Sequence, residues 1–272
     1  MSSMTIGTAP SPPAAQTVGT EKVLWQGAFF CLALVPVTIL AMLIDPRELN
    51  GINLWIKPLK FQLSVGLHIA TLALFARFID DALRDRIGVR ILAWAISGFG
   101  IFEIAYITIQ AGRGRHSHFN LETPMEASMY SLMGIGAVTL IMGAAVVGWL
   151  AYRRPAAGLG QGLRTGILAG LSLGFVTTLA VAGYMSGGTG HWVGGPTTDA
   201  NGLPIVGWAR GGGDLRVPHF FSTHLMQAIP FVGWVADRKS SHPTRWVYGA
   251  CVLGLVVIAA TFVQALMGMP LI

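Results

Sequence analysis

The sequence predicts an all-α membrane protein with seven transmembrane helices, and composition is the first reason. Of the 272 residues, 53% are hydrophobic and only 11% are charged, whereas about 25% of residues are charged in a typical soluble domain. The mean hydropathy is +0.61, and apolar stretches long enough to span a bilayer recur along the chain. These observations exclude an ordinary soluble enzyme, a disordered chain and a nucleic-acid-binding protein.

The apolar stretches define seven helices, each long enough to cross about 30 Å of hydrocarbon. The expected ranges are 23–44, 54–78, 91–111, 124–151, 163–185, 217–236 and 246–269. Thr123-Pro124-Met125-Glu126 has the form of a capping box with proline in the first turn, which predicts the start of the fourth helix. Residues 1–22 are rich in Ala, Pro, Ser and Thr and predict a disordered tail, so residues 23–272 form the single membrane domain.

The basic residues predict the orientation of the chain. With seven spans, eleven Lys and Arg residues lie on the side of the N-terminus and seven on the other side. The first group is Lys22, Arg77, Arg84, Arg86, Arg90, Arg153, Arg154, Arg164, Arg238, Lys239 and Arg245, and the second is Arg47, Lys57, Lys60, Arg113, Arg115, Arg210 and Arg216. Cytoplasmic loops usually hold the excess, so we expect the N-terminus in the cytoplasm and the C-terminus outside.

Glycine is frequent in the connection between the fifth and sixth helices and recurs every four residues on the fifth helix itself. Residues 186–217 form an unusually long connection with His191 and two tryptophans, and we expect it to fold over the outer helix ends as a lid. Gly166, Gly170 and Gly174 form a GxxxGxxxG pattern on the fifth helix, which indicates close packing against another helix.

Polar side chains within the spans are candidate functional groups, because ionisable residues in a membrane are costly. On the second helix Lys57, Lys60, Ser64 and His68 are spaced by three or four residues and share one face. This stripe predicts a hydrated pocket open to the outside. The alternative is that the lysines extend to lipid head groups while His68 is a hydrogen-bonded core residue.

The third helix carries a second polar face. Glu103, Tyr106 and Gln110 lie on it, with Glu103 beyond the midpoint toward the outer side. A buried carboxylate needs a cation, a metal or a proton. We therefore expect Lys60 or Arg113 to form an ion pair with Glu103 or Asp214.

Six of the seven histidines are expected in the outer half of the membrane or in the outer loops. They are His68, His116, His118, His191, His219 and His224, whereas His242 lies on the cytoplasmic side. His116 and His118 form an HxH pair that would suit a shared metal on an extended segment. His219 and His224 are five residues apart, so on a regular helix they do not share a face.

Three motifs connect this polar layer with known sequences. They are WIKPLKF at residues 55–61, RGxxSHFN at 113–120 and GGDLRxxHF at 212–220. Together they resemble a group of functionally unassigned bacterial seven-helix integral membrane proteins. The positions that match are Lys57, Lys60, His118, Asn120, His191, Asp214, Arg216, His219 and His224. The resemblance implies the bacterial cytoplasmic (inner) membrane and supplies no substrate.

The first functional hypothesis is a membrane metalloprotein that acts as an enzyme on a small or lipid-like anionic substrate at the outer face. A divalent metal would draw its ligands from His118, His191, His219 and His224. Glu103 and Asp214 would be the catalytic acid or base groups. The substrate would be bound by Lys57, Lys60, Arg113, Arg216 and Asn120.

Two other hypotheses stay open. The first is a b-type haem protein in quinone-linked electron transfer, with His68 and His224 as axial ligands. The second is a transporter or binding protein for a small anion, in which the same basic residues hold the anion. The expected partners are the lipid bilayer and a lipid or quinone-like ligand, with no nucleic acid.

Overall fold

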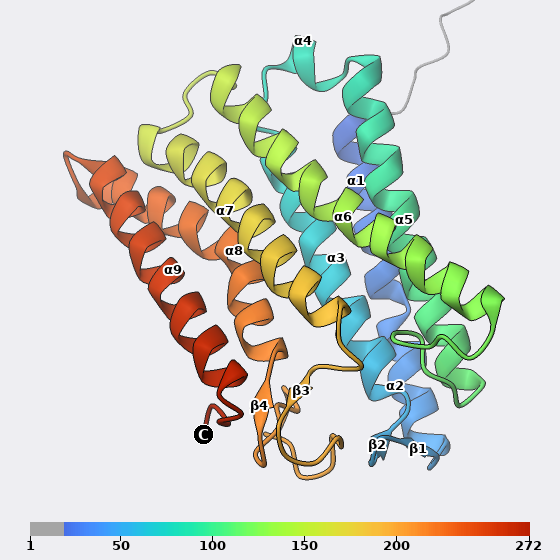
Figure 1. Ribbon diagram of the computed structural model, residues 1–272. Helices are drawn as coiled ribbons and strands as arrows, with labels where there is room; N and C mark the ends of the chain where they lie inside the picture. The colour runs from blue at the N-terminus through green and yellow to red at the C-terminus, as the bar shows by residue number, and fades with distance from the viewer. Residues whose placement is uncertain (1–18) are drawn as a thin grey trace, which may run out of the picture.

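The computed structural model describes residues 19–272, in which long helices run side by side (Figure 1). The helices are α1 Thr20–Ala33, α2 Val35–Ile44, α3 Ile56–Ala76, α4 Asp81–Arg84, α5 Ile87–Gly112, α6 Pro124–Arg153, α7 Gln161–Ser186, α8 Arg216–Lys239 and α9 Pro243–Leu266. Each predicted range thus contains a long helix, and the first is interrupted at Leu34, just before Pro36. The predicted tail falls mostly outside the described residues, but α1 includes its last positions.

Several helix boundaries have local causes. Helix α6 begins at Pro124, and the side chain of Thr123 accepts a hydrogen bond from the backbone N–H of Glu126 at 3.2 Å. The predicted helix start and the Thr123 cap are therefore confirmed, whereas Oε2 of Glu126 accepts the hydroxyl group of Thr123 at 3.1 Å and not its backbone N–H, as a full capping box would require. Helix α7 is capped by another helix, because Asp237 of α8 accepts hydrogen bonds from the backbone N–H groups of Gly162 and Leu163 at 2.7 and 2.8 Å.

Two short antiparallel strand pairs lie at the same end of the bundle (Figure 1). Strands β1 Glu48–Leu49 and β2 Ile52–Asn53 are joined by Asn50 and Gly51, whose φ angles of 55° and 78° suit a type I′ hairpin turn. Strands β3 Trp192–Val193 and β4 Gly213–Asp214 bring together the two ends of the long 187–215 loop. We call this end, which also holds the C-terminus, the C-terminal end of the bundle.

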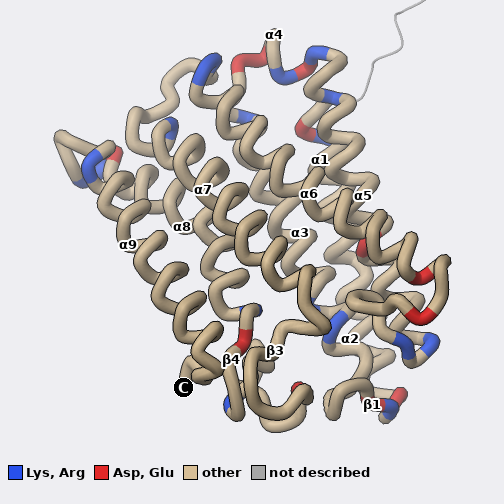
Figure 2. The backbone as a smooth tube through the Cα atoms, in the orientation of Figure 1, with Lys and Arg blue, Asp and Glu red and all other residues tan. Residues whose placement is uncertain are grey.

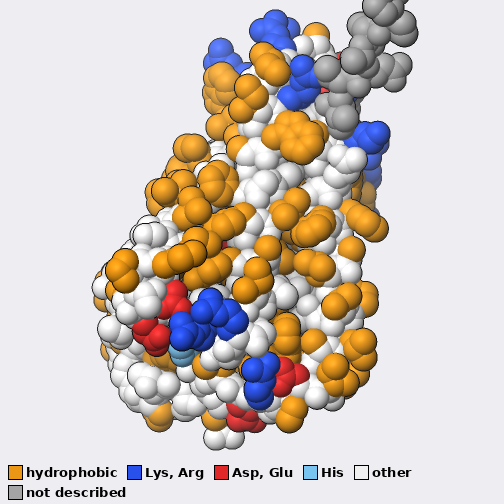
Figure 3. Space-filling view, turned by 90° about the vertical axis from the view of Figure 1, so that its right-hand side faces the viewer, with side chains coloured by type: hydrophobic (Ala, Val, Ile, Leu, Met, Phe, Trp, Pro, Cys, Tyr) orange, Lys and Arg blue, Asp and Glu red, His pale blue; other side chains and the backbone are white. Residues whose placement is uncertain are grey.

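Six helices are long and apolar enough to cross a membrane, when α1 and α2 are taken together as Thr20–Ile44. Helix α8 has 24 residues, but its ionisable and amide side chains leave it less apolar than the others. The charged residues lie mostly near the two ends of the bundle (Figure 2), and hydrophobic side chains cover much of the middle of the face seen in Figure 3. This distribution is typical of a protein that lies in a bilayer.

The helices form two packed groups that meet along α6 and α7. The first buried core joins α1, α3, α5 and α6 with part of α7, and from α8 it takes only Met226. The second core joins α7, α8 and α9. In agreement, α3 packs on α1, α2, α5 and α6, whereas α8 packs on α7 and α9.

The contact between α7 and α8 depends on glycine. A Cβ atom built on Gly170 would lie 2.8 Å from the backbone oxygen of Leu225, and one on Gly166 would lie 3.0 Å from that of Ile229. A Cβ atom on Gly174 would likewise collide with the side chain of Met226. The predicted role of the GxxxGxxxG pattern in close helix packing is therefore confirmed.

Candidate functional site

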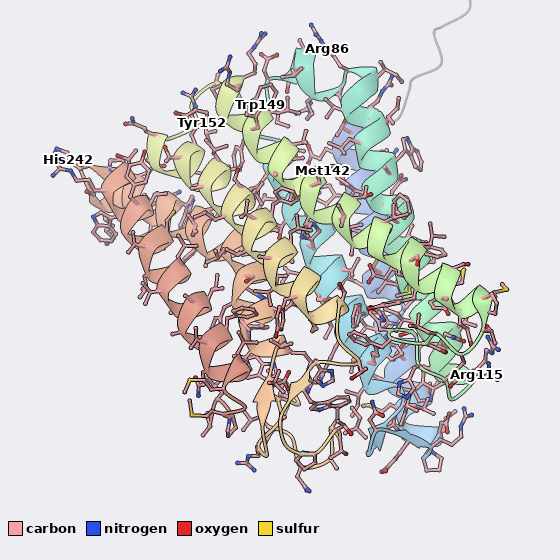
Figure 4. The ribbon with its side chains drawn as sticks, in the orientation of Figure 1. Arg86, Arg115, Met142, Trp149, Tyr152 and His242 are labelled. Atoms are coloured by element: carbon pink, nitrogen blue, oxygen red, sulfur yellow. The ribbon has the colours of Figure 1, made fainter. Side chains whose placement is uncertain are left out.

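The polar residues predicted to matter gather at the C-terminal end of the bundle. This end combines the N-terminal turns of α3 and α8, the C-terminal turns of α5, and the 113–123 and 187–215 loops (Figure 1). Arg115 lies at this end, far from Arg86 and His242 at the other end (Figure 4). The 187–215 loop is tied to the β1–β2 turn, since Asp199 donates its backbone N–H to the carbonyl oxygen of Asn50 at 2.9 Å.

Arg216, the first residue of α8, organises the inner side of the 187–215 loop. Its guanidinium forms ion pairs with Asp199 at 2.8 Å and with Asp214 at 2.7 Å, and it donates to the carbonyl oxygen of Gly207 at 2.7 Å. Asp214 also accepts the backbone N–H groups of Ala209 and Arg216, both at 2.9 Å. Both carboxylates are buried, so this network fixes the loop to the start of α8.

His191 extends this network. Its Nε2 atom lies 3.2 Å from Oδ1 of Asp199, and its ring lies 3.9 Å from that of Trp192. Burial lowers the pKa of His191, although the hydrogen bond to Asp199 opposes this change. Burial would raise the pKa of Asp199, but the hydrogen bond with His191 and the charge of Arg216 outweigh it, so the pKa is lowered. Asp199 is therefore ionised at neutral pH.

Glu103 and His118 form a second cluster between α5 and the 113–123 loop. Nε2 of His118 lies 4.0 Å from Oε1 of Glu103, and both side chains are largely buried. The His118 ring packs beside those of Phe61 and Tyr130, with centroids 5.2 and 6.0 Å away. Burial lowers the pKa of His118 well below its usual value, and the positive charge of Lys57 adds to the effect. His118 is therefore neutral, so it does not place a positive charge beside the carboxyl group of Glu103.

Lys57 lies between the two clusters. The charges that act on its ammonium group are those of Asp199, Glu103 and Arg216. Its Nζ atom lies 5.9 Å from the centre of the Phe61 ring. Within residues 19–272 no carboxylate oxygen lies within 4.0 Å of this Nζ, and it has no hydrogen-bond partner. Lys57 is thus a half-buried cation whose charge no direct contact neutralises.

The predicted ion pair of Lys60 or Arg113 with Glu103 or Asp214 is wrong for the described residues. Lys60 donates instead to the carbonyl oxygen of Val206 at 2.8 Å, and Arg113 donates to Oε1 of Gln110 at 3.0 Å. The physical reason is competition between binding partners. Asp214 is already paired with Arg216, and the carbonyl oxygen of Val206 in the loop is a closer acceptor for Lys60.

The histidines predicted as metal ligands take separate positions. His118 faces Glu103, and His191 faces Asp199. His224 turns back to its own helix, where its Nδ1 lies 2.7 Å from the carbonyl oxygen of Phe220. Nδ1 of His219 is buried without a hydrogen-bond partner in the described part of the chain. Residues 19–272 contain no group of three or more His, Cys, Asp or Glu side chains placed to hold a metal ion, so the predicted histidine cluster is not supported.

The remaining predicted residues are engaged locally. Asn120 is buried and donates to the carbonyl oxygen of His116 at 3.0 Å, which shapes the 113–123 loop. Nε2 of His68 lies 3.2 Å from the carbonyl oxygen of Leu140 on α6, as the interpretation of a hydrogen-bonded core histidine requires. His68 and His224, the proposed haem ligands, are therefore bonded to the backbones of different helices.

Sequence reasoning missed Asp199. It stands in a polar stretch, Pro-Thr-Thr-Asp-Ala-Asn-Gly at 196–202, where no periodicity distinguishes it from a solvated loop residue. Only the fold shows that the loop returns this carboxylate to Arg216. A cavity beside Asp214, between α8 and α9, measures about 10 Å³. That volume is about the space of one water molecule.

Comparisons of this chain with models of protein families, with curated proteins and with solved structures find no match. Function is therefore argued from the geometry of the C-terminal end.

Proposed function

We propose that the chain lies in the bacterial cytoplasmic membrane with seven spans, its N-terminus in the cytoplasm and its C-terminal end outside. Helix α8 is the span that brings the six strongly apolar ones to seven, because its 24 residues give a length of about 36 Å, enough to cross the bilayer. Its polar side chains are acceptable there because α7 and α9 pack against it. The excess of Lys and Arg at the N-terminal end supports the orientation.

In this setting, the C-terminal end binds the anionic group of a small or lipid-like molecule. The observation that carries this proposal is Lys57, a half-buried cation without a carboxylate partner. A cation that is partly removed from water and has no partner favours a ligand of opposite sign. Lys60 lies one helical turn away and holds only a carbonyl oxygen, which leaves its charge available to the same ligand.

Glu103 and His118 give the site a proton-exchanging pair. A neutral imidazole beside a carboxyl group can accept or return one proton, which is the requirement for general acid–base chemistry. The bound anionic group would receive this proton from Glu103 or return it, with His118 as the relay. Asp214 and Arg216 have a different role in the proposal, since their mutual contacts hold the loop over the site.

The metal-dependent and haem-dependent versions of this function have weaker support. The candidate donors do not fit a metal centre in the described residues, since no three His, Cys, Asp or Glu side chains come together there, and the closest approach of a histidine to a carboxylate, 3.2 Å, joins only His191 and Asp199. His68 and His224 are committed to backbone carbonyl groups. Elemental analysis and an absorbance spectrum of the purified protein test both versions directly, since bound metal at one equivalent or a haem band would replace the anion proposal.

Substitution of Lys57 tests the anion proposal. The probe is dihexanoyl phosphatidic acid, a water-soluble molecule with one phosphate monoester, and binding to the detergent-purified protein is measured by calorimetry. We expect Lys57→Gln to weaken binding by about tenfold or more, because a charge-assisted hydrogen bond contributes roughly 1.5–3 kcal/mol.

The matched control is Lys239→Gln, which removes the same charge from the last turn of α8, at the other end of the bundle. We expect it to bind the probe like the unsubstituted protein. Equal affinities in the Lys57→Gln and Lys239→Gln variants would contradict the proposal, because they would show that the cation at the C-terminal site does not hold the anion.

A further inference from the structure

One face of α3 is exposed to the membrane and ends at the proposed site. Leu63, Leu67 and Leu74 on this face are 49%, 47% and 41% exposed, and Ser64 is exposed as well. Lys60 lies on the same side of the helix, one turn before Ser64. From Leu63 to Leu74 the rise is about 16 Å, close to the hydrocarbon thickness of one leaflet. The exposed face therefore runs from the site into the membrane.

Helix α8 presents a matching face beside it. Phe220 and Phe231 are 37% and 62% exposed, and His224 lies between them, one turn after Phe220. The His224 and Phe220 rings stack with centroids 3.9 Å apart. These positions are spaced by four and seven residues, so they follow one side of the helix.

The two faces lie at the same depth. Nε2 of Gln227 on α8 donates to Oγ1 of Thr71 on α3 at 3.1 Å. Both helices start at the C-terminal end, so Phe220, seven residues before Gln227, lies at the level of Ser64, seven residues before Thr71. We call this boundary the α3–α8 seam.

The α3–α8 seam is weakly closed. Within residues 19–272 the bond between Gln227 and Thr71 is the one side-chain hydrogen bond that joins α3 to α8. Two other polar groups at the seam bond to their own helices, since Ser64 donates to the carbonyl oxygen of Phe61 at 3.3 Å and Nδ1 of His224 lies 2.7 Å from that of Phe220. Lys60 bonds to the loop carbonyl oxygen of Val206. The buried cores of the two helix groups also lie on either side of it.

We propose that the α3–α8 seam is a lateral path by which an amphiphile with one anionic head group and a hydrocarbon chain reaches the site from the outer leaflet. This inference rests on the proposed anion-binding function and names its substrate class. The head group is attracted by Lys60 and Lys57, while the chain lies along Leu63 and Leu67. A path from the membrane explains why the apolar face of α3 ends at a lysine.

The test compares two probes with the same head group. Dihexanoyl phosphatidic acid reaches the site from water, whereas dioleoyl phosphatidic acid is confined to the bilayer of phosphatidylcholine nanodiscs that contain the full chain. Leu67→Trp fills the seam with a bulky ring. We expect it to weaken binding of the dioleoyl lipid by roughly tenfold or more, because the chain must displace the ring, and to leave binding of the dihexanoyl lipid unchanged.

Leu253→Trp is the matched control, because Leu253 on α9 is 65% exposed and away from the seam. We expect this variant to bind both lipids normally. The inference is overturned if Leu67→Trp binds the dioleoyl lipid as well as Leu253→Trp does, or if it weakens both lipids equally. Failure of the proposed function has a different signature, since Lys57→Gln would then bind both lipids like the unsubstituted protein.

Discussion

Helix α8 meets its two neighbours in opposite ways. Toward α7 it meets a row of glycines, and its backbone approaches so closely that a Cβ on Gly170 would lie 2.8 Å from Leu225 O. Toward α3 it donates one side-chain hydrogen bond from Gln227, and Phe220 and Phe231 on the same side stay partly exposed. One helix thus combines a close backbone contact on its α7 side with a looser side-chain contact on its α3 side.

The physics of the bilayer explains this division. Lipid chains are as apolar as leucine, so burial alone does not drive helices together within a membrane. Close backbone packing over glycine provides the association of α7 with α8. The α3–α8 seam lacks that packing and costs little to open, which suits a surface that receives a ligand.

The largest expected effect comes from breaking the glycine contact. Gly170→Leu would force the side chain into Pro230 and the backbone of Leu225. We expect the unfolding free energy in detergent to fall by about 3 kcal/mol or more, because overpacking against backbone cannot relax through a rotamer change. Titration with a denaturing detergent, followed by circular dichroism, measures the change.

The control for this substitution is Gly134→Leu on α6. Gly134 has no atom within 4 Å of its virtual Cβ and is exposed, so a leucine there projects into lipid. Its unfolding free energy should stay within about 0.5 kcal/mol of that of the unsubstituted protein. If both variants were equally unstable, the α7–α8 contact would have no special structural role.

A smaller effect is expected at the end of the same contact. Asp237→Ala removes the carboxylate that accepts the backbone N–H groups of Gly162 and Leu163. We expect a loss of about 1–2 kcal/mol in unfolding free energy, because the substitution uncaps the start of α7. Asp81→Ala provides the comparison, since the Asp81 side chain is 84% exposed and should contribute within about 0.5 kcal/mol. Equal losses in the two variants would show that the cap between helices is unimportant.

The pH dependence of the unfolding free energy tests the C-terminal end of the bundle, where His118 lies. The pKa of His118 lies well below its usual value in the folded protein because the ring is buried. As the pH falls below about 6.5, the unfolded chain binds a proton that the folded chain excludes, so the unfolding free energy decreases. We expect the decrease between pH 7 and 5 to be smaller in His118→Gln, by at most about 1.4 kcal/mol per pH unit. Identical pH profiles would contradict the assignment of His118 as a neutral buried group.

Much of the fold follows from patterns that the sequence displays. The apolar stretches predicted the positions of the long helices within a few residues, and six spans are long and apolar enough to cross a membrane. The glycine spacing on α7 predicted close packing but did not identify α8 as the partner. The reason is that a sequence period shows which residues share a helix face, but not which helix packs against that face.

The site was less predictable, because its contacts depend on how the long loop returns to the bundle. The sequence indicated that Glu103, His118 and Lys57 share one end, but not that Lys60 would contact Val206. Asp199 carried no recognisable signal, although it pairs with Arg216. Contacts between residues distant in the chain set these pairings, and no local periodicity encodes them.

The smallest expected effect concerns the α3–α8 seam itself. Thr71→Val removes the acceptor of the Gln227 hydrogen bond, and interhelical hydrogen bonds in membranes contribute on average about 0.6 kcal/mol. We expect a loss of that size in unfolding free energy.

Thr139→Val is the matched control, because Thr139 donates only to Ile135 O of its own helix and faces outward. A double-mutant cycle of Thr71→Val with Gln227→Leu should give a similarly small coupling energy. A coupling above about 2 kcal/mol would mean that the α3–α8 seam is held firmly, and the contrast between the two faces of α8 would disappear.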